Sequence, residues 1–190
     1  MLKEIERKYK IKEKITSPAV IDTDPNYISL LALIFALEAG YLFYIGMNIL
    51  GALFILLNGY LDMLDGEIAE KFSKKTRLGD LLDHTLDRIA DIAVLLGISA
   101  GPYVPWWLGS ITTIAVLLVS YMGTQHQALG EDRLYGGLFG RSDRIITIFL
   151  VGILSFFVPE ALFYGICIIL SFSIITFLQR FWLSIRMLKK

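Results

Sequence analysis

Residues 49–72 read ILGALFILLNGYLDMLDGEIAEKF, and residues 78–100 read LGDLLDHTLDRIADIAVLLGISA. Both stretches are long enough to cross a bilayer, because about 20 residues of helix span its hydrocarbon core. Acidic side chains nevertheless interrupt both stretches, and each acid at mid-membrane costs about 2.5–3.5 kcal/mol on insertion scales. These acids are Asp62, Asp65, Glu67, Glu70, Asp80, Asp83, Asp87 and Asp91. Such acids favour the interpretation that a functional site lies within the membrane.

The composition of the whole chain also indicates a membrane protein. Of its 190 residues, 55% are hydrophobic and 19% are charged, whereas ordinary soluble domains are about 45–50% apolar. The 18 basic and 18 acidic residues balance to a net charge of zero. The chain therefore has no excess of positive charge that would indicate nucleic acid as a partner. The one cysteine, Cys167, excludes an internal disulfide and a cysteine-cluster metal site.

Turn residues divide the apolar sequence into six predicted membrane-spanning helices. They are expected at residues 27–45, 49–72, 78–100, 104–129, 141–158 and 160–187. Residues 1–20 are expected to form an amphipathic helix on the membrane surface, because apolar and basic side chains are mixed there. The predicted fold class is therefore an all-α integral membrane protein, with six transmembrane helices over residues 27–187 preceded by an amphipathic juxtamembrane helix.

The basic residues predict the orientation of the chain. None of the 18 falls in the connections near residues 46, 102 and 159. The positive-inside rule then places both termini and the two remaining connections in the cytoplasm. We therefore expect a multi-pass protein of the cell membrane whose acidic site faces the cytoplasm.

The acids of the second and third spans share helix faces. Asp62 and Asp65 lie at i and i+3, and Asp83 and Asp87 lie at i and i+4. Because the two helices are antiparallel and turn near Lys74, Asp62 is expected at the depth of Asp87. Asp65 is likewise expected at the depth of Asp83, about 10 Å from the cytoplasmic end. Four carboxylates should therefore converge in a pocket that opens to the cytoplasm.

Carboxylates at contact distance repel one another unless cations lie among them. An all-oxygen site suits Mg²⁺ or Mn²⁺, and paired divalent ions commonly serve phosphoryl chemistry. An ion-coupled transporter is the alternative, because intramembrane acids also form proton or cation relays. The sequence predicts two divalent ions held by Asp62, Asp65, Asp83 and Asp87. Small residues that would let a nucleotide pyrophosphate approach the helices are Gly66, Ala69 and Gly79.

Two further expectations concern the neighbours of the acids. His84 is expected to point about 100° around the helix from Asp83 and to serve in helix packing. Pairing of the acids with basic side chains is disfavoured, because Arg88 is the one basic residue near them within these two spans.

The order of these residues resembles a known signature. Asp62-x2-Asp65-Gly66-x2-Ala69-Glu70 is followed, after eight residues, by Gly79-x3-Asp83-x3-Asp87. The pattern D-x2-D-G-x2-A-R-x8-G-x3-D-x3-D is typical of the CDP-alcohol phosphotransferase family, integral membrane enzymes of phospholipid synthesis. Seven of its eight fixed positions match, and the six-span layout extends the resemblance over nearly the whole chain. Glu70 stands where the pattern has arginine.

The resemblance implies that residues 1–190 form a single transferase domain of this family. Its members move a phosphatidyl-type group from a CDP-lipid to a polar alcohol and release CMP. The donor is then CDP-diacylglycerol or CDP-archaeol, and the state is a homodimer, as in relatives. A non-catalytic CDP-lipid-binding homologue is an alternative that Glu70 favours.

The resemblance also assigns roles to residues. Asp62, Asp65 and Asp83 hold metal, and Asp87 lies at the second metal and takes the proton of the acceptor hydroxyl. Asp83 and Asp87 are thus the candidate catalytic residues. Lys71, Lys74, Lys75 or Arg77 can replace the missing motif arginine at the donor phosphates. The expected nucleotide-binding residues are Gly66, Ala69, Gly79, Asp65, Lys74 and Arg77.

Arginines near the start of the fifth predicted span are candidates for binding the acceptor. Arg133, Arg141 and Arg144 lie on the side of the acids, and arginine binds phosphate through bidentate hydrogen bonds. Membrane-flanking charge is the alternative interpretation. Arg141 and Arg144 resemble a paired-arginine position in archaetidylinositol phosphate and phosphatidylinositol phosphate synthases, whose acceptor is inositol phosphate. Residues 120–128 lack further arginines of those relatives, which leaves glycerol phosphate open as the acceptor.

Overall fold

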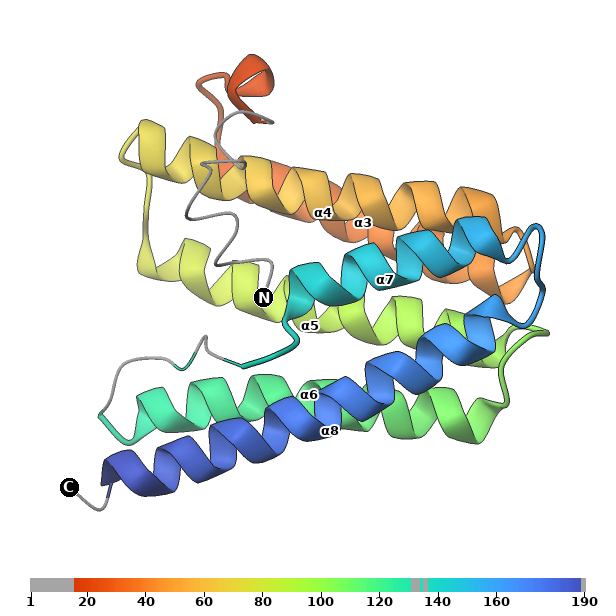
Figure 1. Cartoon of the computed structure of the whole chain (residues 1–190). Coiled ribbons are helices and arrows are strands. Elements are labelled where there is room, and N and C mark those ends of the chain that lie inside the picture. Colours follow the sequence, from red (N-terminus) through yellow and green to blue (C-terminus); the bar gives the residue numbers. More distant parts are fainter. Residues whose placement is uncertain (1–15, 131–133, 135–136, 189–190) are drawn as a thin grey trace.

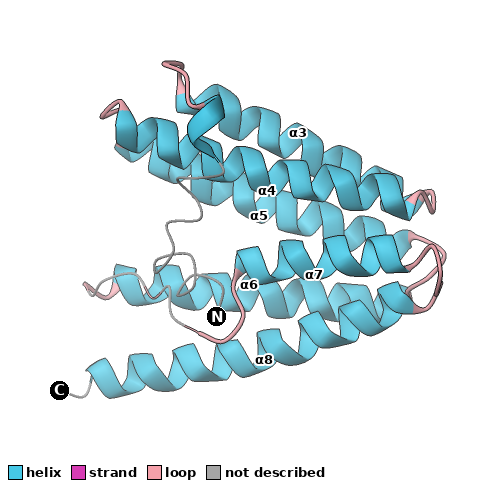
Figure 2. Ribbon diagram, turned by 45° about the horizontal axis from the view of Figure 1, so that its top comes forward, coloured by secondary structure: helices cyan, strands magenta, loops and turns pink. Residues whose placement is uncertain are grey.

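The computed structural model describes residues 16–130, 134 and 137–188. Within these ranges the chain is helical and contains no strand, which confirms the all-α prediction (Figures 1 and 2). A short 3-10 helix precedes six longer helices. They are α3 (Pro25–Tyr44), α4 (Asn48–Lys71), α5 (Arg77–Ala100), α6 (Trp106–Ala128), α7 (Arg141–Leu154) and α8 (Ala161–Leu188).

The observed helices follow the predicted spans closely, with one larger difference. The fifth span was expected to reach Val158, but α7 ends at Leu154. Residues 155–158 form turns that lead to Pro159 and the start of α8. The first 15 residues of the predicted amphipathic segment lie outside the described part of the chain.

Four of the six helices are long and apolar enough to cross a membrane, namely α3, α4, α6 and α8. Helices α5 and α7 do not meet this criterion, because the acids of α5 lower its apolar content and α7 has only 14 residues. The fold is therefore that of a multi-pass helical membrane protein. That all six helices span the bilayer, as the sequence suggests, stays a prediction.

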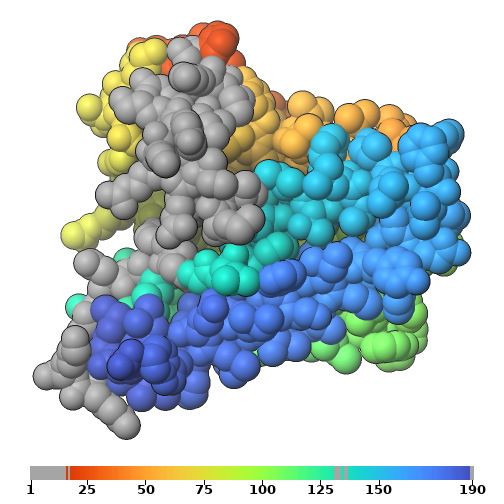
Figure 3. Space-filling view, viewed as in Figure 1, coloured from red at the N-terminus to blue at the C-terminus, as the bar shows by residue number. Residues whose placement is uncertain are grey.

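The six helices form two groups joined by α7. In one group α3 packs against both α4 and α5, and in the other α6 packs against α8. Helix α7 contacts α4 on one side and α8 on the other, and its side chains lie between theirs on the face shown in Figure 3. Helix α5 also contacts α6, which links the groups a second time. The N-terminus of α7 is thereby brought beside α4 and α5 (Figure 1).

Side-chain caps determine where three of the helices begin. The Asp24 carboxylate accepts a hydrogen bond from the Asn26 N–H at 2.9 Å, at the start of α3. Thr76 Oγ1 accepts from the Gly79 N–H at 2.9 Å, at the start of α5. Asp143 accepts from the Gly140 N–H at 2.8 Å, at the start of α7. Each cap satisfies a backbone donor that has no partner within its helix.

Helices α3 and α5 approach so closely that their backbones touch. A Cβ atom on Gly40 would lie 2.4 Å from the carbonyl oxygen of Ala93. A Cβ atom on Gly97 would lie 2.1 Å from the carbonyl oxygen of Gly40. Small residues at helix contacts allow such approach in membrane proteins, where van der Waals packing drives association. This contact fixes α5, with its row of aspartates, against α3.

Replacement of Gly97 by alanine is expected to separate α3 from α5 and to destabilise the fold by about 1–3 kcal/mol. The quantity to measure is the thermal unfolding temperature of the purified protein in detergent. Gly140→Ala is the matched control, because its Cβ would meet no atom closer than 3.6 Å. An unchanged unfolding temperature for Gly97→Ala would show that the helices are not this close.

Candidate functional site

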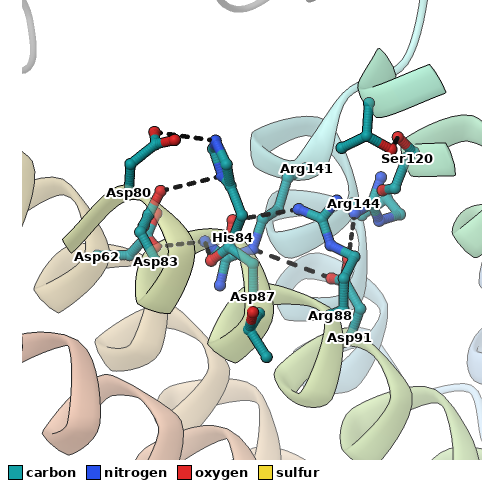
Figure 4. A network of polar contacts seen from close by, with 12 residues as sticks. Asp62, Asp80, Asp83, His84, Asp87, Arg88, Asp91, Ser120, Arg141 and Arg144 are labelled. Atoms are coloured by element: carbon teal, nitrogen blue, oxygen red, sulfur yellow. Dashed lines mark hydrogen bonds and ion pairs between the residues drawn. The ribbon is translucent and has the colours of Figure 1, made fainter. Parts of the chain in front are cut away.

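Three aspartates from α4 and α5 come together near the end of the bundle where these helices are joined. Asp62, Asp65 and Asp83 each offer one carboxylate oxygen, and these oxygens all lie within 4.8 Å of one another. Figure 4 shows Asp62 and Asp83 side by side on their two helices. The structure thus brings together three of the four aspartates that the hairpin geometry groups. Oxygen atoms at this spacing suit a hard divalent cation.

Helix α3 contacts the most buried of these three carboxylates. Asp65 is 5% exposed, and the Ser29 hydroxyl donates a hydrogen bond to its Oδ2 at 2.6 Å. Ser29 lies one turn into α3, after the Asp24 cap. The sequence reasoning missed Ser29, because a single serine in an apolar helix carries no signal of its distant partner.

The fourth aspartate, Asp87, faces an arginine from α7. Arg141 Nη1 lies 2.6 Å from Asp87 Oδ1 and 2.6 Å from Asp62 Oδ1 (Figure 4). On α4, Asn58 lies one turn before Asp62, and its Oδ1 accepts a longer bond of 3.4 Å from Arg141 Nη2. The Asn58 amide donates to the Ala32 carbonyl of α3 at 2.8 Å. Asp62 and Asp87 therefore share a depth, as the hairpin predicts, and share one guanidinium.

This arrangement corrects the expectation that the acids are not paired with basic side chains. That expectation considered the second and third spans alone, where Arg88 is the basic residue. In the structure α7 supplies Arg141 from a distant part of the sequence, and Arg88 also contacts Asp87, at 3.3 Å.

Arg144 forms a buried ion pair one helical turn beyond Arg141. Its Nη2 lies 2.6 Å from Asp91 Oδ2, and the residue is 4% exposed. Arg141 Nε lies 4.0 Å from the other oxygen of Asp91. The pair therefore joins the start of α7 to α5 and lies behind Arg141 as seen from the aspartate cluster (Figure 4).

His84 lies against the cluster, which contradicts its expected role in helix packing. His84 Nδ1 is 3.2 Å from Asp83 Oδ2, and Nε2 is 3.3 Å from Asp80 Oδ1. The expectation considered only the direction of the Cβ atom, whereas the imidazole folds back along the helix. His84, Asp83 and Asp87 also form a second group whose ligand atoms lie within 4.8 Å of one another.

The basic residues between α4 and α5 do not enter the aspartate cluster. Lys74 contacts Asp22 and donates to the Thr23 carbonyl at 2.9 Å. Lys75 lies 3.3 Å from Glu70, the residue at the motif arginine position. Arg77 is exposed at the start of α5. The expected acceptor residue Arg133 lies outside the described residues.

Small residues flank the cluster where the sequence analysis expects a nucleotide. Gly66 and Ala69 follow Asp65 on α4 and are half-buried. On α5, a Cβ at Gly79 would lie 3.2 Å from Thr76 Oγ1 and 3.5 Å from Asn26 Oδ1. A pocket beside the cluster is lined by side chains of α3, α4, α5 and α7, among them Ser29, Asn58, Asp62, Asp83, Asp87 and Arg141.

A bundle of apolar helices around a buried set of aspartates and arginines defines a multi-pass membrane protein with charged side chains at its centre. The chain belongs to the CDP-alcohol phosphatidyltransferase family, whose family model matches residues 23–178. It is therefore a phospholipid-synthesis transferase of this class, as the signature indicates.

Similar proteins cover most of the chain. Archaetidylinositol phosphate synthase of Pyrococcus horikoshii is 31% identical over 179 residues, which cover 90% of this chain and 93% of that protein. Phosphatidylinositol phosphate synthase of Mycobacterium tuberculosis is 34% identical over 155 residues, which cover 73% of this chain and 68% of that protein. The crystal structure of the M. tuberculosis enzyme with CDP-DAG bound has a TM-score of 0.78 at 27% identity and covers 92% of this chain and 94% of that chain. A second structure of that enzyme, with manganese and citrate, has a TM-score of 0.77 at 27% identity and covers 92% and 87%.

Replacement of Asp91 by alanine is expected to lower the free energy of unfolding by about 3–5 kcal/mol, because it leaves the buried Arg144 guanidinium without its partner. The double variant Asp91→Ala, Arg144→Met removes both charges and should recover most of that loss. Denaturant titration in detergent measures the free energy of unfolding of the single and the double variant. Asp80→Asn, which alters an exposed acid of the same helix, is the control. Wild-type stability of Asp91→Ala would contradict a structural role for the pair.

Proposed function

We propose that this chain transfers a phosphatidyl-type group from a CDP-lipid to a phosphorylated polar alcohol and releases CMP. The observation that carries the proposal is the grouping of Asp62, Asp65 and Asp83, whose oxygens lie within 4.8 Å of one another in the order of the family signature. The donor is CDP-diacylglycerol or CDP-archaeol. CDP-DAG bound to the similar M. tuberculosis enzyme supports this choice.

Divalent cations, Mg²⁺ or Mn²⁺, are the proposed cofactors of this site. The donor set fits them, because Asp62, Asp65 and Asp83 supply carboxylate oxygens and Asp87 lies at the adjoining position. Manganese in the second M. tuberculosis structure is consistent with this fit. When bound, the ions neutralise the pyrophosphate and stabilise CMP as it leaves.

The chain's own residues perform the remaining tasks in the proposed reaction. The acceptor hydroxyl oxygen forms a bond to the lipid-linked phosphorus, and the bond from that phosphorus to the CMP oxygen breaks. Asp87 is the base that receives the hydroxyl proton, because it borders the pocket beside the cluster. Gly66, Ala69 and Gly79 are the small residues of α4 and α5 that are proposed to lie along the nucleotide.

Contacts to the donor phosphates are assigned to the basic connection between α4 and α5. Lys74 and Arg77 are the residues proposed to bind the donor phosphates. Asp65, Gly66 and Gly79 are proposed to lie beside the same nucleotide. Lys75 pairs with Glu70 and so places a positive charge next to the motif arginine position.

Arginines at the start of α7 are proposed to bind the acceptor phosphate, together with Arg133. Arg141 is the more accessible, with 15% of its side chain exposed, and it lines the pocket. Arg144 is paired with Asp91. Its guanidinium is proposed to donate a further N–H to the acceptor phosphate from the far side of Arg141. Similarity to archaetidylinositol phosphate synthase favours inositol phosphate as the acceptor, with glycerol phosphate as the second choice.

The proposed setting is a cell membrane crossed by six helices over residues 27–187, with residues 1–20 on its surface and a homodimer as the assembly. Both termini and the acidic site then face the cytoplasm, since the basic connections lie on that side. This orientation brings the site to water-soluble acceptors while the donor lipid stays in the bilayer.

Asp83→Asn or Asp87→Asn is expected to reduce CMP release from CDP-diacylglycerol by at least about 100-fold, because the site loses a metal ligand or its base. The protein should remain folded, which its elution and unfolding temperature in detergent report. Glu160→Gln, an acid at the opposite end of the bundle, is the matched control. Undiminished CMP release in either variant would refute the proposal. Substrate flux across sealed vesicles without CMP release would instead identify a transporter.

A panel of alcohols identifies the acceptor. With CDP-diacylglycerol as donor, mass spectrometry of the lipid product should show that inositol phosphate is consumed in preference to inositol or glycerol. Arg141→Ala should raise the KM for the phosphorylated acceptor at least about tenfold, because a charge-assisted bond to phosphate is worth about 1.5–3 kcal/mol. At saturating Mg²⁺ the KM for the donor should stay the same. Equal use of unphosphorylated alcohols would contradict the acceptor assignment.

A further inference from the structure

The guanidinium of Arg141 lies between two aspartates of the cluster. Its Nη1 is 2.6 Å from Asp62 Oδ1 and 2.6 Å from Asp87 Oδ1. All three side chains are largely buried, with exposed fractions of 15% for Arg141, 28% for Asp62 and 13% for Asp87. The three charges are thus in direct contact at a place with little water (Figure 4).

A divalent ion held between Asp62 and Asp87 would meet carboxylate oxygens that Arg141 now contacts, because Nη1 lies 2.6 Å from Oδ1 of each residue. Mg²⁺ would lie about 2.0–2.1 Å from the oxygens it used. The guanidinium is positively charged and would repel a cation so close to it. Arg141 and a cation at this position would therefore compete for the same two carboxylates.

The other cation position does not compete with Arg141. Asp65 is held by Ser29, and Asp83 lies against His84. Asp62 belongs to both cation positions. Arg141 contacts its Oδ1, which leaves Oδ2 for an ion shared with Asp65 and Asp83. A cation among Asp62, Asp65 and Asp83 can thus bind while Arg141 stays in place.

We propose that Arg141 is a built-in competitor for the second divalent cation, so that the two cations bind with unequal affinity and in order. The first ion binds at Asp62, Asp65 and Asp83. The second binds at Asp62 and Asp87 as the guanidinium moves away, which frees Arg141 for an acceptor phosphate. This inference rests on the proposed function, since it assumes that the aspartates bind metal.

The helix start that carries Arg141 is anchored by contacts that do not involve the Arg141 side chain. The Asp91–Arg144 ion pair anchors the first turn of α7 to α5. The Gly140–Asp143 cap holds the helix start. By contrast, the bond from Arg141 to Asn58 is long, at 3.4 Å, and the pocket borders the guanidinium. Arg141 is therefore a residue that controls metal binding by position and is not itself a ligand.

The test is a titration of the purified, substrate-free protein with Mn²⁺, in which electron paramagnetic resonance reports free and bound ion. The wild type should show one tight and one weaker Mn²⁺ site per chain. In Arg141→Ala the weaker site should tighten at least about tenfold, which corresponds to about 1.4 kcal/mol of lost competition. The tight site should change little. Arg141→Gln, which keeps a polar side chain, should behave in the same way and covers the case in which the alanine variant does not fold.

Arg186→Ala is the matched control, because this arginine stacks on Trp182 near the end of α8. Its Mn²⁺ titration should equal that of the wild type. An unchanged weaker site in folded Arg141 variants, or two equal sites in the wild type, would overturn the inference and leave the proposed function standing. Absence of any Mn²⁺ binding in the wild type would refute both.

Discussion

Acidic side chains placed within apolar helices must find positive charge, and this constraint explains the architecture of the site. An unpaired charge in the membrane or in a protein interior is costly to bury. The chain meets the constraint with arginines from α7, outside the α4–α5 hairpin that carries the acids, together with Arg88 of α5. Arg141 contacts Asp62 and Asp87, and Arg144 contacts Asp91. Helix α7 is therefore the element that completes the site, although it is the shortest of the six.

The other helices contribute position. The glycine contact between α3 and α5 holds the two backbones together, and Ser29 of α3 then reaches Asp65 on α4. Asn58 joins α4 to α3 and also meets Arg141. These polar contacts connect α3, α4 and α7 over about two turns of α4, so that carboxylates from different helices share a small volume. A pocket beside the acids is lined by side chains of the same helices.

Local periodicity and spacing predict much of this structure. The positions of the helices follow from apolar length and turn residues, and the grouping of Asp62, Asp65 and Asp83 follows from the arithmetic of an antiparallel hairpin. Contacts between distant segments do not follow, because nothing near Asp87 in the sequence indicates that Arg141 will face it. The direction of the His84 ring was missed since it depends on a side-chain torsion. The early end of α7 escaped prediction because residues 155–158 are as apolar as the helix before them.

Aspartates of α4 and α5 are proposed to bind a divalent cation together within the helical bundle. Anomalous diffraction at the manganese edge, from crystals of the protein grown with Mn²⁺, would locate that cation. We expect an anomalous peak within coordination distance of carboxylate oxygens from Asp62, Asp65 and Asp83. Manganese bound elsewhere, or the three side chains turned toward separate protein partners with no peak between them, would rule out this metal site.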